Sequence, residues 1–120
     1  MAKILVVDDS VSMQKMVTLT LKTAGYEVVE ASDGSQALSI AQKESVDLVL
    51  SDVNMPNMNG IELCQKIRQL PNYKFTPFLM LTTESAGDIK MKGKAAGATG
   101  WLVKPFNPSQ LLATVKKVIT

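Results

Sequence analysis

Residues 3–10 read Lys-Ile-Leu-Val-Val-Asp-Asp-Ser, an apolar run that ends abruptly in two carboxylates. A nearly continuous run of this kind, rich in β-branched side chains, is typical of a strand buried on both faces of a parallel sheet. Related runs recur along the chain, and the strands that we expect span residues 3–7, 26–31, 48–50, 78–81 and 100–103. The first, third and fourth of these runs are nearly continuous, so we expect these three strands to be buried on both faces. The first stretch therefore predicts a sheet with helices packed on both of its faces.

Segments with apolar residues at helical spacing lie between these runs. The expected helices run from Met13 to a stop at Gly25, around residues 37–41, from Gly60 to Leu70, across residues 84–98, and from Leu111 to Ile119. The segment 84–98 is expected to be the loosest helix, because each glycine in a helix interior costs about 1 kcal/mol. Parallel strands need long crossovers, which these segments supply. We therefore predict an α/β fold, a flavodoxin-like five-stranded parallel sheet of order 2-1-3-4-5 flanked by five helices.

Composition narrows the classes of function. The 120 residues are 46% apolar and 20% charged, so we expect residues 1–120 to form a single domain without a separate output domain. The chain has no histidine, which excludes Ser-His-Asp catalysis and imidazole metal ligation. Its one cysteine, Cys64, has no partner for a disulfide, as is usual in the cytoplasm, where we expect this protein.

The apolar run at the N-terminus is too short for a signal peptide, and no other segment approaches the roughly 20 apolar residues of a membrane span. The net charge of +2 is too small to indicate nucleic-acid binding. We therefore expect a monomer with neither a membrane nor a nucleic acid among its partners. The charge is uneven, since Glu84 to Thr120 contain six lysines and two acids, and this basic C-terminal third is the candidate face for a protein partner.

Polar side chains follow the ends of four expected strands. Asp8 and Asp9 follow the first, Asp52 the third, Thr82 the fourth and Lys104 the fifth. In a doubly wound parallel sheet, ligands bind beyond the carboxyl ends of the strands, so these side chains are expected to converge. Two charges about 4 Å apart interact by about 4 kcal/mol at an effective dielectric of 20, so three carboxylates beside one lysine repel one another. A divalent cation relieves this repulsion, and an all-oxygen site suits Mg²⁺, with Mn²⁺ as a substitute.

Each of these residues alone has a simpler interpretation. Asp8 or Asp9 could cap the following helix, Asp52 could be a turn residue, Thr82 an ordinary strand residue and Lys104 a solvated loop lysine. Complementary side chains at four strand ends on one edge of the sheet are much less expected by chance. The combination therefore indicates a binding site.

Four motifs, in this order and at these spacings, resemble those of a known family. They are Val7-Asp8-Asp9-Ser10, the stretch Ser-Asp-Val-Asn-Met-Pro-Asn-Met-Asn-Gly at 51–60, Leu81-Thr82-Thr83-Glu84, and the stretch Gly-Trp-Leu-Val-Lys-Pro-Phe at 100–106. Over essentially its whole length the chain resembles the receiver domains of two-component response regulators. Within that family it is most similar to the single-domain, CheY-like chemotaxis receivers.

The resemblance implies a role for each matching residue. Asp52 is then the aspartate that accepts the phosphoryl group from the phosphohistidine of a sensor histidine kinase. Asp8, Asp9 and Asp52 are then the Mg²⁺ ligands, helped by the backbone carbonyl of Asn54. Lys104 is then the counter-ion of the phosphoryl group, and its peptide bond to the following proline is expected to be cis.

Other positions are implied to control the switch and the lifetime of the phosphorylated state. Thr82 matches the hydroxyl that closes on the phosphoryl group. Trp101 stands where the chemotaxis receivers have a switching tyrosine, and Val53 stands where they have tryptophan, so a phenolic hydrogen bond is not part of this switch. Asn54 and Glu84 match positions that modulate the access of water to the phosphorylated aspartate, which implies fast hydrolysis.

The implied function is that of a phosphorylation-activated response regulator, which catalyses only its own phosphorylation and dephosphorylation and is not otherwise an enzyme. Its output is then a protein–protein contact through the basic C-terminal face. In chemotaxis the expected partner is the flagellar motor switch, with a phosphatase as a further partner. The alternative is a phosphorelay intermediate or another stand-alone receiver with a different partner.

Two functions of other classes share this type of sheet. Haloacid-dehalogenase phosphatases also form an aspartyl phosphate with Mg²⁺, but they need a second aspartate two residues after the nucleophile. Asn54 occupies that position after Asp52, and Ser10 occupies it after Asp8. A flavodoxin-like FMN protein needs a phosphate cradle after the first strand, where Asp8 and Asp9 repel a phosphate. Both alternatives are therefore disfavoured.

Overall fold

The computed structural model describes residues 2–83 and 87–119, and for residues 87–89 it describes the backbone alone. The strands are β1 (Lys3–Val7), β2 (Glu27–Ala31), β3 (Leu48–Asp52), β4 (Phe78–Thr82) and β5 (Gly100–Val103). The helices are α1 (Val11–Thr23), α2 (Gly34–Lys43), α3 (Gly60–Arg68), α4 (Gly87–Ala96) and α5 (Pro108–Ile119), with a short 3-10 helix, η1 (Pro71–Tyr73). Within these described ranges, no helix is both long and apolar enough to cross a bilayer.

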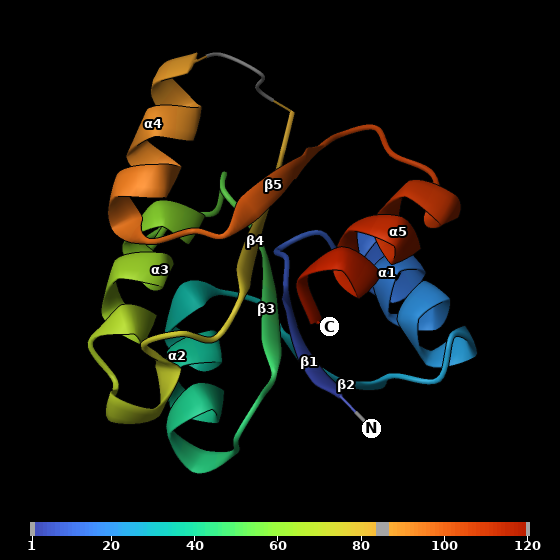
Figure 1. Cartoon of the computed structure of the whole chain (residues 1–120), viewed down its shortest axis with the longest axis horizontal. Helices are drawn as coiled ribbons and strands as arrows, with labels where there is room; N and C mark the ends of the chain where they lie inside the picture. The colour runs from blue at the N-terminus through green and yellow to red at the C-terminus, as the bar shows by residue number, and fades with distance from the viewer. Residues whose placement is uncertain (1, 84–86, 120) are drawn as a thin grey trace.

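The five strands form one parallel sheet of order β2-β1-β3-β4-β5, as predicted. Helices α1 and α5 cover one face of the sheet, and α2, α3 and α4 cover the other (Figure 1). The chain therefore winds in both directions from the centre of the sheet. This arrangement places a topological switch point between β1 and β3, where parallel sheets bind their ligands.

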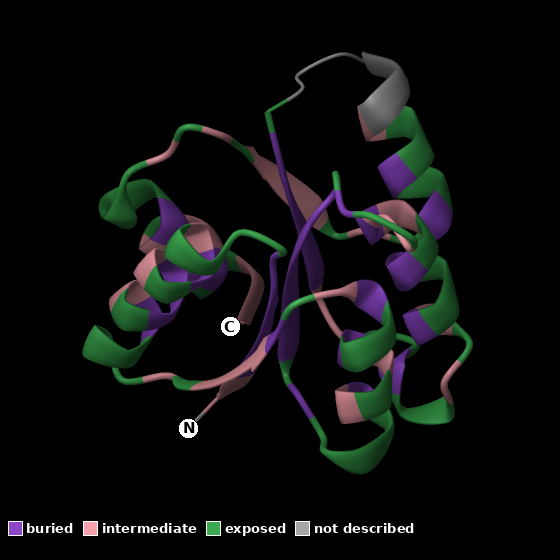
Figure 2. Ribbon diagram, turned by 180° about the vertical axis from the view of Figure 1, so that it is seen from behind, coloured by how far each residue is buried: buried purple, intermediate pink, exposed green. Residues whose placement is uncertain are grey.

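The three central strands form the core. Every residue of β3 and β4 is buried, as are four of the five residues of β1. The edge strands β2 and β5 are only partly buried, and Figure 2 shows the central strands in purple between the two helical layers. Two clusters of apolar side chains pack against the sheet. The prediction that the first, third and fourth strands are buried on both faces is confirmed.

The elements differ from the prediction mainly at their ends. β3 extends to Asp52 and β4 to Thr82, so each of these side chains belongs to the last residue of a strand. Helix α1 begins at Val11, earlier than predicted, because the Ser10 side chain caps its first turn. Helix α3 ends two residues earlier than predicted and η1 follows. The segment expected to be the loosest helix contains α4, and residues 84–86 of that segment lie outside the described part of the chain.

Gly60 brings the start of α3 against the end of β3. A Cβ atom at this position would overlap with the carbonyl oxygen of Asp52 and lie 3.0 Å from the Cα of Val53. The Gly60 amide donates a hydrogen bond to the Val53 carbonyl oxygen (3.0 Å). Asn59 and Glu62 form a capping box at the same helix start. The backbone that follows Asp52 is therefore held by close packing against α3.

Candidate functional site

Three carboxylates meet beyond the carboxyl ends of β1 and β3. Ligand oxygens of Asp8, Asp9 and Asp52 lie within 4.8 Å of one another. Asp8 and Asp52 are buried, with 2% and 7% of their surfaces exposed, whereas Asp9 is exposed. The register of the two strands, which sets Val7 beside Ser51, brings the three residues to the same place. Their predicted convergence is confirmed.

One ammonium group contacts both buried carboxylates. The Lys104 Nζ lies 3.4 Å from Asp52 Oδ1 and 3.6 Å from Asp8 Oδ2, and the lysine side chain is 13% exposed. The interpretation of Lys104 as a solvated loop lysine is therefore wrong. Its amide donates to the Thr82 carbonyl oxygen (2.7 Å), and its peptide bond to Pro105 is cis, as predicted. One positive charge beside three carboxylates leaves negative charge in excess.

The Asp8 carboxylate is oriented through one of its oxygens. Oδ1 accepts a hydrogen bond from the Ser10 amide (2.9 Å), whereas Oδ2 is buried without a hydrogen-bond partner. The cap of α1 is Ser10, whose Oγ accepts from the Met13 amide (3.4 Å), so Asp8 is not the cap. A buried carboxylate oxygen without a donor is unfavourable unless a cation compensates for it. This all-oxygen set of donors fits a hard divalent cation such as Mg²⁺.

Burial raises the pKa of Asp52, because surroundings of low polarity disfavour the charged carboxylate. The Lys104 ammonium acts in the opposite direction, and the nearby Asp8 raises the pKa further. The Asn54 amide donates a long hydrogen bond to Asp52 Oδ1 (3.4 Å) and also favours the charged form. Ionisation of Asp52 therefore lowers the stability of the fold, an effect that a bound cation offsets.

Thr82 and Trp101 lie on the side of the site next to α4. Thr82 is the buried last residue of β4 and is paired with Val103. Trp101 is paired with Met80 and is partly buried in the apolar cluster of that layer. The Nζ of Lys90, on α4, lies 5.7 Å from the centre of the Trp101 ring, which is a cation–π contact. The tryptophan is therefore positioned against α4.

The remaining predicted positions are less directly involved. Asn54 follows β3 with an exposed side chain, and its role as a carbonyl ligand stays a prediction. Its role in the lifetime of the phosphorylated state is likewise a prediction, and Glu84 lies outside the described residues. Val53, which stands where the chemotaxis receivers have tryptophan, is 3% exposed and packs in the apolar core.

Gln14 is a residue of the site region that the sequence pattern missed. It is 6% exposed, and its Nε2 donates to the carbonyl oxygens of Ala31 (2.8 Å) and Asp8 (3.3 Å). The buried face of α1 consists of residues 14, 17, 18 and 21. This helical spacing is the signal that could have revealed Gln14, but a pattern of apolar residues alone overlooks a polar side chain at a core position.

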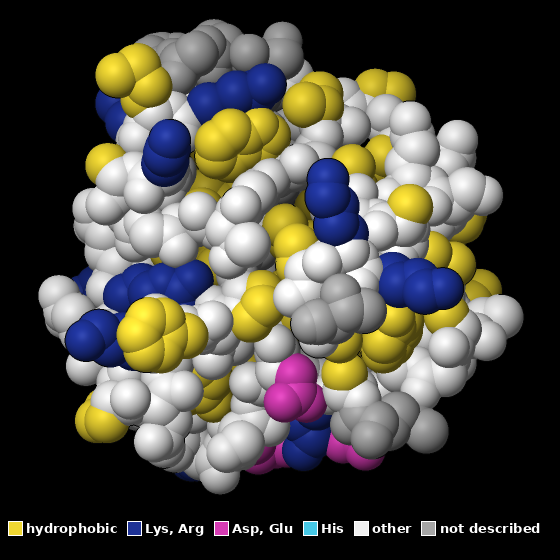
Figure 3. Space-filling view, viewed as in Figure 1, with side chains coloured by type: hydrophobic (Ala, Val, Ile, Leu, Met, Phe, Trp, Pro, Cys, Tyr) yellow, Lys and Arg dark blue, Asp and Glu magenta, His cyan; other side chains and the backbone are white. Residues whose placement is uncertain are grey.

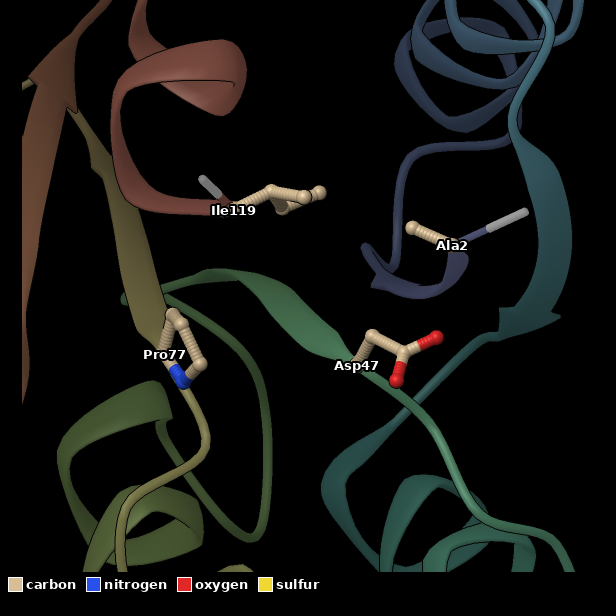
Figure 4. Close-up of a pocket in the computed structure, with 4 residues that line it drawn as sticks. All are labelled: Ala2, Asp47, Pro77 and Ile119. Carbon is tan, nitrogen blue, oxygen red and sulfur yellow. The ribbon is translucent and has the colours of Figure 1, made fainter.

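A cavity of about 400 Å³ opens at the opposite edge of the sheet. Its lining residues are Ala2, Asp47, Pro77 and Ile119 (Figure 4). Of these four only Asp47 is ionisable, and its Oδ2 already accepts a hydrogen bond from the Lys3 amide (2.8 Å). This cavity therefore offers no group of functional side chains comparable to the acidic cluster.

The fold and the acidic cluster together define a class of protein. The family described as response regulator receiver domain matches residues 4–116, and the chain belongs to this family. It is thus the receiver domain of a phosphorylation-activated response regulator. Neither of the two alternatives from the sequence, the phosphatase and the FMN protein, is the family that matches.

Solved structures of receiver proteins are similar to this chain. The chain is similar to the chemotaxis protein CheY4 of Vibrio cholerae, with 58% identity, a TM-score of 0.96 and coverage of 98% of both chains. It is also similar to the receiver domain of the sensor histidine kinase PA1611 from Pseudomonas aeruginosa PAO1, with 28% identity and a TM-score of 0.91 over 98% of this chain and 97% of the other. That structure has a magnesium ion coordinated in its active-site cleft.

Curated relatives include transcriptional regulators. The alkaline phosphatase synthesis transcriptional regulatory protein PhoP of Bacillus subtilis is 40% identical over 117 residues, which are 98% of this chain and 48% of the relative. The transcriptional regulatory protein ResD of the same organism is 35% identical with the same coverage. The chain spans about half the length of these curated relatives.

Replacement of Asp52 by asparagine should stabilise the metal-free protein at neutral pH. Because the pKa of Asp52 is raised by folding, the folded state holds this proton more tightly than the unfolded state does, and stability falls as the pH rises above about 4. In EDTA at pH 7.5, Asp52→Asn should raise the Tm by roughly 2–5 °C, and the gain should shrink as the pH is lowered toward about 4. Thermal melts followed by circular dichroism measure both effects.

Two further melts control this prediction. Asp9→Asn should also raise the Tm in EDTA, but by less, because Asp9 is exposed. Stabilisation by added Mg²⁺ should be smaller in both variants than in the wild type. A lower Tm for Asp52→Asn than for the wild type in EDTA would show that charge crowding at the cluster is not the dominant effect.

Proposed function

We propose that the chain accepts a phosphoryl group on Asp52 from the phosphohistidine of a sensor histidine kinase, with Mg²⁺ held at the acidic cluster. The supporting observation is the Lys104 ammonium within 3.6 Å of both Asp8 and Asp52, next to a buried Asp8 oxygen that has no hydrogen-bond partner. A nucleophile, a positioned cation and a place for a second cation therefore share one cluster. The magnesium in the cleft of a similar receiver domain supports the same proposal.

The proposed transfer is an in-line displacement at phosphorus. A carboxylate oxygen of Asp52 forms the new bond while the bond from phosphorus to the histidine nitrogen breaks, which leaves an acyl phosphate on the chain. Asp8, Asp9, Asp52 and the Asn54 carbonyl would hold the Mg²⁺, which when bound supplies positive charge to the phosphoryl oxygens. Lys104 already contacts the attacking carboxylate, so its ammonium is close enough to follow the charge onto the phosphoryl group.

The proposed chemistry is confined to the chain's own aspartate. Hydrolysis of the acyl phosphate resets the protein, and no separate substrate is turned over, so the chain is not an enzyme in the usual sense. Asn54 and Glu84 are proposed to control the access of water and to keep the lifetime short. A separate phosphatase is a proposed partner, and Mn²⁺ is a proposed substitute for Mg²⁺.

Acetyl phosphate should label the chain once, on Asp52, and only when a divalent metal is present. Mass spectrometry of the intact chain should show one added phosphoryl group in Mg²⁺ or Mn²⁺ and none in EDTA. Asp52→Asn should lose the label, whereas Asp47→Asn, at the opposite edge of the sheet, should keep it. Labelling of Asp52→Asn at the wild-type level, or equal labelling in EDTA, would contradict the proposed reaction.

The proposed switch joins Thr82 to Trp101 and α4. Thr82 is the hydroxyl proposed to close on the phosphoryl group, and Trp101 is partly buried beside the same strand, against Lys90. A Cβ atom on Gly93 would lie 3.7 Å from the Trp101 ring, so the indole and α4 are close neighbours. A movement of Thr82 can therefore reach α4 through the position of the indole.

Activation should bury Trp101 more deeply. Complete burial of an aromatic side chain stabilises by about 1.5–3 kcal/mol, which is within the range that a bound phosphoryl group can bias. Beryllofluoride with Mg²⁺ should shift Trp101 emission to shorter wavelength and reduce quenching by iodide, and Asp52→Asn should abolish both effects. Trp101 is the only tryptophan, so the signal has one source. If emission and quenching stay unchanged while mass spectrometry confirms phosphorylation of the chain, Trp101 is a static packing residue.

The basic face is the proposed surface for the output partner. Lys and Arg side chains are spread over the face shown in Figure 3, whereas Asp and Glu side chains gather at its lower edge. Lys92 and Lys94 on α4 and Lys116 on α5 are exposed. Met91, also on α4, is 73% exposed and adds an apolar contact. This combination suits an acidic partner segment that carries apolar side chains.

The proposed pathway is chemotaxis, with the flagellar motor switch as the partner. The likeness to the chemotaxis protein CheY4 over nearly all of both chains supports this proposal. A second candidate is a phosphorelay intermediate or another receiver with a partner outside the motor. The curated relatives, which are transcriptional regulators about twice as long as this chain, support the second candidate. The cytoplasm is the proposed location in either case.

Binding to the motor switch protein of the same organism separates these candidates. The chain treated with beryllofluoride should bind roughly tenfold more tightly than the untreated chain. Met91→Ala on α4 should weaken this binding, whereas Leu19→Ala on α1, which also removes an exposed apolar side chain, should not. If neither form of the chain binds the switch protein, the chemotaxis proposal is wrong and the second candidate is favoured.

A further inference from the structure

Gln14 is one of the few polar side chains buried in this fold. It lies in the first turn of α1 and is 6% exposed, and its Nε2 donates to two backbone carbonyl oxygens. One of them belongs to Ala31, the last residue of β2, at 2.8 Å, and the other to Asp8, which follows β1, at 3.3 Å. The side chain therefore ties the helix to the carboxyl ends of two neighbouring strands.

These bonds hold the backbone at the first acidic residue of the site. The Asp8 amide donates to the Ala31 carbonyl oxygen (3.1 Å), and the Asp8 carbonyl oxygen accepts from Gln14. Both ends of the Asp8 residue are thus anchored to groups that are themselves buried. A buried amide is unfavourable unless it is hydrogen-bonded, so the two bonds keep Gln14 in place as firmly as they keep Asp8.

The anchoring adds to two contacts of the Asp8 side chain, one with the Ser10 amide and the other with the Lys104 ammonium, which lies 3.6 Å from Oδ2. Its Oδ1 accepts from the Ser10 amide, but its Oδ2, on the side of Asp52 and Lys104, has no hydrogen-bond partner. The direction in which Oδ2 points therefore depends on the position of the Asp8 backbone as well as on Lys104. Residues that fix a metal ligand in this way, without touching the metal, typically contribute on the order of 10–100-fold to metal affinity.

We infer that Gln14 is a positioning residue for the acidic cluster, which it prepares for the divalent cation by fixing the Asp8 backbone. This inference rests on the proposed Mg²⁺-dependent function of the cluster. Gln14 itself touches neither the cation nor the phosphoryl group. It acts through Asp8, and no other side chain is described with a hydrogen bond to the Asp8 carbonyl oxygen.

Thr18, one turn further along α1, provides a matched control. It is also buried, at 8% exposure, and its Oγ1 donates to Glu30 Oε2 on β2 (2.6 Å). Thr18 therefore fastens the same helix to the same strand, β2, and its described hydrogen bond does not involve Asp8. Gln14→Met removes the two hydrogen bonds that Nε2 donates, and Thr18→Val removes the one that Oγ1 donates, while each substitution nearly preserves the volume of the side chain.

The first measurement is calorimetric titration of Mg²⁺ into the full metal-free chain. Gln14→Met should weaken Mg²⁺ binding by about tenfold, and Thr18→Val should leave the Kd at the wild-type value. Both variants should lower the Tm, since Gln14→Met loses two hydrogen bonds and Thr18→Val loses one. An affinity of Gln14→Met equal to that of the wild type, or an equal loss of affinity in both variants, would show that Gln14 only fastens the helix.

The second measurement needs no metal. The Ser10 amide donates to Asp8 Oδ1, so its hydrogen exchange, followed by NMR in EDTA, reports the orientation of the Asp8 carboxylate. This amide should exchange faster in Gln14→Met than in the wild type and at the wild-type rate in Thr18→Val. Unchanged exchange in Gln14→Met would overturn the inference.

The two measurements separate this inference from the proposed function. If the wild type itself does not bind Mg²⁺, the proposed function fails, and the exchange of the Ser10 amide still decides the role of Gln14. If Gln14→Met does not fold, Gln14→Asn replaces it, because its amide is one methylene too short to reach both carbonyl oxygens. A folded Gln14→Asn chain with wild-type Mg²⁺ affinity and wild-type amide exchange would overturn the inference.

Discussion

Two buried carboxylates share one lysine at the carboxyl edge of the sheet, and this contact of like and unlike charges constrains the rest of the molecule. The Lys104 Nζ lies 3.4 Å from Asp52 and 3.6 Å from Asp8. Its single positive charge does not balance the three carboxylates of the cluster. Such a cluster persists only if the backbone that carries it cannot relax. The fully buried strands β3 and β4 and the nearly buried β1 provide this rigidity.

The two ends of the sheet differ accordingly in what they can do. At the carboxyl end, the acidic cluster holds an excess of negative charge, and the neighbouring strands β4 and β5 carry Thr82 and Trp101 on the side of α4. At the amino end, Asp47 and Lys3 are joined by a hydrogen bond, and the cavity there collects no further charged side chain among its four lining residues. The proposed signal therefore originates in the imbalance of charge at the carboxyl edge.

Much of the site could be read from the sequence, because side chains that follow buried runs are placed together by any doubly wound sheet. Asp8, Asp9, Asp52 and Lys104 were found in this way. The roles of Gln14 and Gly60 could not be found in the same way. A glutamine within a helix or a glycine at a helix start occurs in many structural settings, so neither residue type indicates a particular contact. Their importance lies in contacts with backbone atoms far away in the sequence, which periodicity does not encode.

The sequence by itself determined the order of strands and helices and the residue types at the strand ends, because hydrophobic periodicity and strand-end position are local properties of the chain. Only the tertiary structure decided that the Asp8 Oδ2 lacks a donor, that Lys104 contacts two carboxylates, and that the backbone after Asp52 lies against α3. These features depend on distances of a few ångströms between segments remote in the chain. Such distances are set by the packing of whole layers, so no local pattern of residues contains them.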